Sequence, residues 1–156
     1  MLQQYNRIMV AVDGSQEAEL AFKKALNVAK RNQAELLLLH VIDARAFQTM
    51  TSFDTMLAEQ ATDMAKNSLK EYEETAQKAG VDRIKTLIEY GSPKTVIAKY
   101  TPDEYNIDLI LLGATGLNAV ERLFIGSVSE YVIRHAPCDV LVVRTDLDNH
   151  LPKEDE

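Results

Sequence analysis

Residues 109 to 135 read LILLGATGLNAVERLFIGSVSEYVIRH, and they predict more of the fold than any other stretch of the chain. Leu109–Leu112 is a short apolar run of strand length. The segment Gly113–Ser127 follows, with glycines near both of its ends. Val128–His135 then has helical spacing of its apolar residues, and Pro137 excludes further helix. The pattern predicts a strand, a glycine-containing connection and a helix.

Strand-like and helix-like runs alternate along the rest of the chain. The expected strands are Arg7–Val12, Glu35–Val41, Ile84–Tyr90, Leu109–Leu112 and Val140–Val143. Helical periodicity predicts one helix after Ser15, a long one from Leu57 to Gly80, a short one from Ser92-Pro93 to about Tyr100, and Val128–His135. Strands that alternate with helices indicate an α/β fold with a parallel, doubly wound sheet and right-handed crossovers.

Two segments fall outside this alternation. Asp43–Asp54 has no clear periodicity and is expected to be a loop, a candidate lid or contact surface. The apolar residues in and beside it either form a contact patch or fold back over the core, and the second alternative is favoured; they are Phe47, Met50, Phe53 and Met56. The polar stretch 146–156 is expected to be a frayed tail after a domain at 1–145.

Composition limits the classes of function. With 156 residues, 46% of them hydrophobic, the chain is expected to be one soluble globular domain. A net charge of −7 and the lack of a basic patch argue against nucleic-acid binding. No apolar run approaches membrane-spanning length and no signal-peptide core precedes Arg7, so a cytoplasmic location is expected. Cys138 is the only cysteine and is interpreted as a small core residue rather than a nucleophile.

The glycine segment is suited to binding an anion. Gly113 and Gly116 can take backbone angles closed to other residues and let a ligand approach the main chain. Gly126 and Ser127 would present free N–H groups at a helix start, and the hydroxyls of Ser127 and Ser129 could bond a phosphate. A plain turn followed by a capped helix is the alternative. Neither a P-loop motif nor a GxGxxG after the first strand occurs.

The combined motifs resemble the universal stress protein family. The pattern G-x2-G-x9-G-S from Gly113 to Ser127 continues as Val128-Ser129-Glu130, and His135-Ala136-Pro137-Cys138 precedes the last strand. Val10-Ala11-Val12-Asp13-Gly14-Ser15 and Leu39-His40-Val41-Ile42-Asp43 are similar to the ends of that family's first two strands. The similarity extends from about Asn6 to Arg144.

This resemblance implies an open five-stranded parallel sheet of order 3-2-1-4-5, with helices on both faces and ATP over the carboxyl ends of strands one and four. Val12, Asp13 and Val41 would face adenine and ribose, and the later residues ribose and phosphates. The implied nucleotide-binding residues are Ala11, Val12, Asp13, Val41, Leu112, Gly113, Thr115, Gly116, Gly126, Ser127, Val128 and Ser129. At Ala114 and Thr115 the family often carries bulkier side chains.

Several single residues allow two interpretations. Asp13 either binds the nucleotide or its Mg²⁺ ion, or is a turn residue that caps a helix. Arg122 is interpreted as a solvated loop residue, with contact to a phosphate as the alternative. His40 is expected to be a hydrogen-bonded residue at a strand end, and His135 to lie at a helix C-terminus. His150 falls in the polar tail.

The resulting hypothesis is an ATP-binding regulatory protein of the stress response that acts as a nucleotide-dependent dimeric switch. Val140–Val143 would be an edge strand, which is prone to pair with a second copy, so a homodimer through this strand is expected. A slow ATPase or phosphotransferase is the first alternative, although neither a positioned base nor a strong electrostatic clamp is identified. A nucleotide-free dimeric scaffold is the second.

Overall fold

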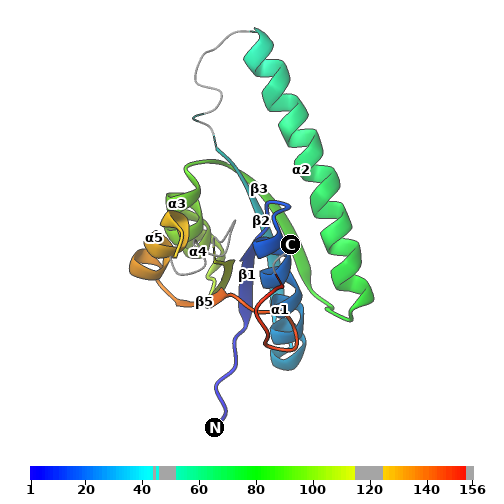
Figure 1. Cartoon of the computed structure of the whole chain (residues 1–156), viewed down its shortest axis with the longest axis vertical. Helices are drawn as coiled ribbons and strands as arrows, with labels where there is room; N and C mark the ends of the chain where they lie inside the picture. Colours follow the sequence, from blue (N-terminus) through cyan, green and yellow to red (C-terminus); the bar gives the residue numbers. More distant parts are fainter. Residues whose placement is uncertain (44, 46–51, 115–124, 154–156) are drawn as a thin grey trace.

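A computed structural model describes residues 1–43, 45, 52–114 and 125–153 of the chain. It contains one parallel sheet whose strands lie in the order β3-β2-β1-β4-β5 (Figure 1). The strands are β1 (Arg7–Ala11), β2 (Glu35–Asp43), β3 (Ile84–Gly91), β4 (Leu109–Gly113) and β5 (Asp139–Val143). The predicted α/β class, the five parallel strands and their order are confirmed.

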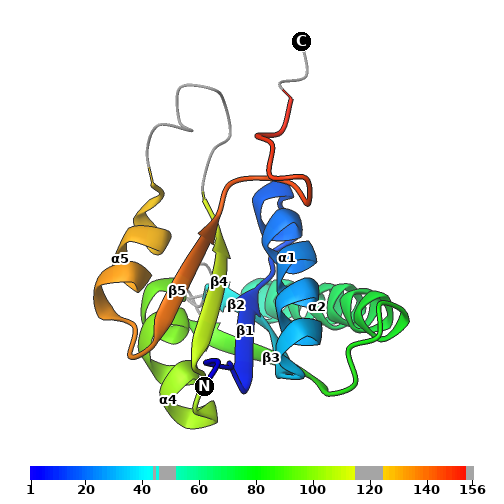
Figure 2. The ribbon, with the colours of Figure 1, turned by 90° about the horizontal axis from the view of Figure 1, so that it is seen from below.

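Helices cover both faces of the sheet (Figure 2). They are α1 (Gln16–Asn32), α2 (Ser52–Lys78), α3 (Pro93–Thr95), the π-helical turn η2 (Val96–Tyr100), α4 (Thr101–Tyr105) and α5 (Ser127–His135). α1 and α2 pack on one face, and the other helices pack on the opposite face. None of the helices in the described part of the chain is long and apolar enough to cross a bilayer.

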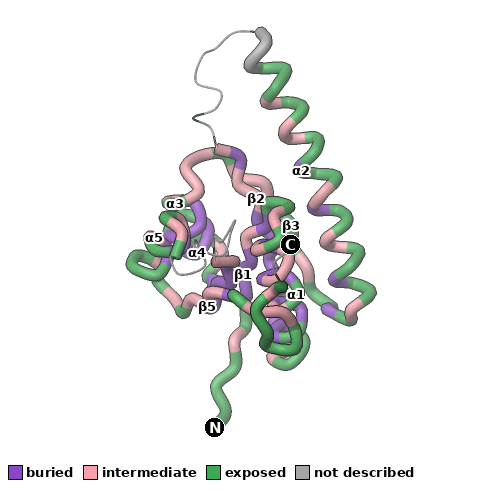
Figure 3. The backbone as a smooth tube through the Cα atoms, viewed as in Figure 1, coloured by how far each residue is buried: buried purple, intermediate pink, exposed green. Residues whose placement is uncertain are grey.

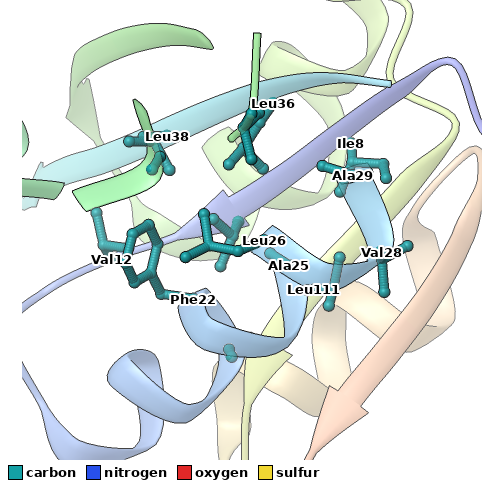
Figure 4. Packing of buried hydrophobic residues seen from close by; sticks show 14 of the residues in the cluster. Ile8, Val12, Phe22, Ala25, Leu26, Val28, Ala29, Leu36, Leu38 and Leu111 are labelled. Carbon is teal, nitrogen blue, oxygen red and sulfur yellow. The ribbon is translucent and has the colours of Figure 1, made fainter. Parts of the chain in front are cut away.

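Successive strand residues point to opposite faces, so two cores form, one on each side of the sheet. Ile8 and Leu38 belong to the core under α1, together with Phe22 from that helix (Figure 4). Met9 and Leu37 belong to the core under η2 and α5. The continuous apolar runs of the central strands are therefore explained by burial on both faces.

The strand register places a gap at one end of the sheet. Pairing between β1 and β4 ends at Val10 and Leu111, whereas β4 and β5 stay paired to Gly113 and Val143. β1 pairs with β2 on its other side. The sheet therefore extends from β1 through β2 and β3 in one direction and through β4 and β5 in the other. This is the topological switch point at the carboxyl ends of the strands, where open α/β sheets hold ligands.

Helix α2 begins earlier than predicted and its first turns stand away from the sheet (Figures 1 and 3). The apolar periodicity begins near Leu57 because only the later part of the helix packs on the sheet, where Ala65 and Leu69 are buried. Met56 is 53% exposed, so the predicted fold-back over the core is wrong for this residue. Phe47, Met50 and the side chain of Phe53 lie outside the described part.

The helical segment after β3 continues to Tyr105 instead of ending near Tyr100. Pro102 has no N–H group and would break the bonding of a regular helix. The π-helical turn before it takes a wider spacing, in which the N–H of Thr101 donates to the carbonyl of Val96. Asn106, in the left-handed conformation, then ends the segment.

The segment after β5 is ordered, so the expectation of fraying from residue 146 is wrong for residues 146–150. The Nζ of Lys24 on α1 donates to Thr145 Oγ1 at 2.6 Å and to Asn149 Oδ1 at 3.1 Å. Asp146 accepts the N–H group of His150 at 2.9 Å and closes a turn. Further along, residues 151 and 152 border a cavity of about 330 Å³ beside the first turns of α1.

Candidate functional site

A cavity of about 400 Å³ lies at the switch point. The ends of β1, β2 and β4 form its floor, and η2, α5 and the start of α1 form its walls. Nine of the predicted residues line it: Ala11, Val12, Asp13, Val41, Leu112, Gly113, Ser127, Val128 and Ser129. Gly126 precedes α5 as its N-cap but is not in the lining. Thr115 and Gly116 lie outside the described residues, as does Arg122.

The α5 N-terminus supplies hydrogen-bond donors at one end of the cavity. The first bond of this helix runs from the Glu130 N–H to the Gly126 carbonyl at 2.9 Å. The N–H groups of Ser127, Val128 and Ser129 precede that bond, and within the described residues none of them has an acceptor. Gly126 has no side chain with which to cap them. Three open donors at the positive end of a helix dipole suit an anion.

The Ser129 side chain already has a hydrogen-bond partner within the chain, which the sequence reasoning did not foresee. Ser129 is 4% exposed, and its hydroxyl donates to the Gly113 carbonyl at 3.1 Å. The hydroxyl of Ser127 is exposed and has no partner within the described residues. Ser127 therefore offers both its N–H and its hydroxyl to a ligand, whereas Ser129 offers its N–H.

Gly113 is required for a different reason from the one predicted. Its φ is not positive, unlike that of Gly14, so it does not need unusual backbone angles. A Cβ atom at Gly113 would overlap the carbonyl oxygen of Glu17, because the start of α1 crosses directly over the end of β4. The next amide is also unavailable to a ligand, since the N–H of Ala114 donates to Val143 at 3.1 Å.

The turn after β1 explains Asp13 as a structural residue. Its Oδ1 accepts the Ser15 N–H at 2.9 Å, and Gly14 between them has φ +82°. Ser15 then caps α1, with its hydroxyl accepting the Ala18 N–H at 3.2 Å. Asp13 is exposed at the cavity edge, so the same carboxylate remains accessible from solvent.

The predicted hydrogen bond of His40 is confirmed, but the strand continues past it to Asp43, so His40 does not lie at the strand end. His40 on β2 reaches across to the end of β1, where its Nδ1 lies 2.9 Å from the carbonyl oxygen of Val12. Because a carbonyl only accepts, this nitrogen is assigned as the protonated one. The bond fixes the main chain directly before Asp13. His135 is the last residue of α5, also as predicted.

The opposite end of the cavity is apolar. Val41 on β2 faces it together with three residues that the sequence reasoning missed, which are Leu39, Pro93 and Ile97. Pro93 and Ile97 lie in the helical segment after β3, and this segment follows the carboxyl end of a parallel strand. That position was a usable signal, because such connections border the switch-point crevice. Flat apolar walls suit the faces of an aromatic base.

The charges around the cavity are negative. Asp13 and Glu17 are in the lining, and no lysine, arginine or histidine of the described residues joins them. Among the described residues, no group of three metal-ligating side chains is assembled anywhere. An anion in this cavity would therefore depend on the α5 N–H groups and on any cation that accompanies it.

Cys138 does not add a nucleophile to the site. It is half-buried and packs against the core under η2 and α5. Burial, and to a smaller degree the charges of Asp108, Asp139 and Asp103, raise the pKa of its thiol to about 11. The thiolate is the reactive form, so this cysteine is unreactive near neutral pH, in agreement with its interpretation as a core residue.

Comparison with known proteins places this architecture in a family. The model of the universal stress protein family matches residues 4–144. A protein of Staphylococcus haemolyticus that is named as a universal stress protein is 50% identical over 142 residues, which cover 91% of this chain and 86% of that protein.

Solved structures agree with this match. Universal stress protein UspA from Lactobacillus plantarum superposes with a TM-score of 0.82 at 38% identity, over 92% of this chain and 100% of the other. A universal stress protein in complex with cAMP has a TM-score of 0.70 at 24% identity, over 90% and 98%. A family member from Arabidopsis thaliana with AMP bound has a TM-score of 0.67 at 23% identity, over 92% and 94%. The chain belongs to the universal stress protein family.

Proposed function

We propose that this protein binds adenine nucleotides, ATP with Mg²⁺ among them, and acts as a nucleotide-dependent dimeric switch in the stress response. One observation carries the proposal. Nine of the predicted nucleotide-binding residues line a single cavity, which has N–H donors without a described acceptor at one end and apolar walls at the other. A nucleotide has the same division between phosphates and base. We assign the nucleotide-binding domain to residues 1–145 and the tail to 146–156.

The proposed pose follows from the two ends of the cavity. The base lies between Val41 and Ile97, and the phosphates lie at the first turn of α5. Two more distant structures of the same fold hold cAMP and AMP, and their identity to this chain is low, so they support the fold's capacity rather than this pose. A cytoplasmic location belongs to the proposal, because adenine nucleotides are abundant there.

The residues present fit a Mg²⁺ ion only in company with phosphates. Asp13 supplies one exposed carboxylate, and Glu17 lies beside it in the lining. Mg²⁺ is commonly bound by one or two carboxylates, phosphate oxygens and water. When bound, the ion would offset charge between phosphates and these carboxylates. The part of Asp13 is to hold it through the oxygen that does not accept the Ser15 N–H.

Dimerisation is proposed through β5. This strand is at the edge of the sheet, and its Leu141 is 41% exposed. Ile133 on the neighbouring α5 is 45% exposed. An edge strand with exposed apolar residues readily pairs with another chain. Because Gly113 in the cavity is paired with Val143 on β5, a ligand that shifts the end of β4 also shifts this edge.

Calorimetry with ATP, AMP and cAMP tests the binding proposal, and light scattering with and without ligand tests the switch. We expect Val41→Glu to weaken nucleotide binding at least tenfold, since it places a charge against the base. Leu57→Glu, on the remote and exposed first turns of α2, is the matched control and should bind as the parent does. A parent protein that binds none of the three nucleotides would refute the proposal.

A further inference from the structure

The carbonyl of Gly113 lies beyond the last residues at which β4 pairs with β1. The N–H of Ala114, in the same peptide unit, points to Val143 on β5. Because the peptide is planar and trans, the Gly113 carbonyl points the opposite way, towards β1. Pairing of β1 with β4 has already ended at Val10 and Leu111, so β1 offers no partner there. A carbonyl at the edge of a cavity must find another donor or remain unsatisfied.

Ser129 supplies that donor from outside the sheet. Its hydroxyl lies 3.1 Å from the Gly113 oxygen and is buried. Ser129 is the third residue of α5, and its own N–H is one of the three open donors at the helix start. The same residue thus joins the helix to the strand end and contributes to the anion-binding group. Among the described residues, this is the side-chain hydrogen bond that joins α5 to β4.

The bond has two consequences for an anion in the cavity. It fixes the direction in which the N–H groups of residues 127–129 point. It also occupies the carbonyl oxygen of Gly113, whose negative end would otherwise lie beside the phosphates and repel them. Both consequences concern the charged part of a nucleotide, and neither concerns the base, which lies at the apolar end near Val41 and Ile97.

We propose that Ser129 is a positioning residue that makes the site selective for the phosphorylated form of its ligand, through its bond to the Gly113 carbonyl and not through direct contact of its hydroxyl with phosphate. This inference rests on the proposed nucleotide binding and assigns the selection of nucleotide over nucleoside. The discriminating quantity is the ratio of AMP affinity to adenosine affinity.

Calorimetry with adenosine, AMP and ATP is the test. In Ser129→Ala we expect AMP and ATP to bind ~5- to 10-fold more weakly, the loss of about one hydrogen bond, with adenosine changed less than twofold. Ser129→Thr retains the hydroxyl and should restore the ratio. Thr75→Ala removes a comparable bond, from Thr75 Oγ1 to the Glu71 carbonyl on α2, and should change nothing.

A second measurement does not depend on any ligand. The carbonyl ¹³C resonance of Gly113 should shift in Ser129→Ala and return in Ser129→Thr. Ser129→Cys, with a weaker donor of similar shape, gives an intermediate ratio and serves if the alanine variant does not fold.

The outcomes separate the two claims. If the parent binds none of the three ligands, nucleotide binding itself is refuted and the role of Ser129 falls with it. If the parent binds them and Ser129→Ala weakens adenosine and AMP equally, or weakens neither, only the role of Ser129 is refuted.

Discussion

Two helices begin beside the same cavity, and they begin in opposite ways. At α1 the Ser15 hydroxyl accepts the Ala18 N–H, the Asp13 carboxylate accepts the Ser15 N–H, and Glu17 makes this end negative. At α5 the cap residue is Gly126, and the first N–H groups have no acceptor among the residues that the structure describes. The two helix ends are thus distinguished by their caps. We infer that an anion would bind at α5 rather than at α1.

The largest expected effect comes from Gly113, which contacts both helix ends. We expect Gly113→Ala to lower the free energy of unfolding by about 3 kcal/mol, because its Cβ would overlap the main chain of Glu17 and push α1 away. Urea denaturation measures the change.

Gly14→Ala is the control for that experiment. A Cβ at Gly14 meets nothing within 4 Å, and only its φ of +82° opposes substitution, so we expect a smaller cost of about 1 kcal/mol. Equal costs at the two glycines would contradict the account of Gly113 as a contact residue.

Converting the α5 end into one like α1 should remove the anion site. Gly126 has ordinary backbone angles, φ −63° and ψ 158°, so Gly126→Asp needs no backbone change. Its carboxylate would cap the open N–H groups, and we expect about 100-fold weaker ATP binding with the helix at least as stable. Gly126→Asn occupies the donors without the charge and should have a smaller effect. Unchanged ATP affinity in the aspartate variant would refute the α5 site.

Because the start of α1 is negative, we expect nucleotide affinity to depend more strongly on Mg²⁺ as the number of phosphates in the nucleotide increases. A phosphate chain that extends from α5 towards Asp13 and Glu17 approaches two carboxylates, and a cation is needed between them. We expect chelation of Mg²⁺ to weaken ATP binding on the order of tenfold and AMP binding less than twofold. Titration with and without EDTA is the measurement. An ATP affinity that is independent of Mg²⁺ would remove Asp13 from the metal assignment.

The smallest expected effect is the difference in stability between two serine variants, one at the start of each helix. Ser15→Ala removes a cap bond and should cost about 1 kcal/mol of stability. Ser127→Ala removes a hydroxyl that has no partner among the described residues and should cost less than about 0.5 kcal/mol. Thermal melting without ligand compares them. A larger cost at Ser127 would show that α5 has a cap of its own.

Strand and helix positions could be predicted because their signals are local, whereas the strand order was implied by the family resemblance. Buried parallel strands are apolar on both faces, and Gly113, Gly126 and Ser127 gave a specific family pattern. The location of the cavity residues followed from that pattern, and nine of them were found around one cavity. The predicted helix boundaries were wrong in two places. α2 begins at Ser52, several residues before the part of the helix that packs on the sheet, and the helical segment after β3 continues through Pro102 by way of a π-helical turn.

The structural roles of individual residues were harder to predict, because these roles depend on contacts with residues that are distant in the sequence. The sequence shows that residue 113 is glycine, but not that Glu17 lies against it. Likewise, a serine near a helix start indicates an anion ligand as readily as a bond to a strand carbonyl, and Ser129 makes the second. Pro93 was identified as a helix start, yet its place at the cavity depends on how the strands align in space.

The contact of Lys24 with the segment after β5 has a practical consequence. After this contact, Leu151 and Pro152 lie along the first turns of α1, next to the candidate site. The two termini leave the molecule at opposite ends of the sheet (Figure 2). A tag at the C-terminus would follow residues that border the cavity beside α1, whereas Met1 is far from the candidate site. Ligand assays on this protein are best made with amino-terminal tags.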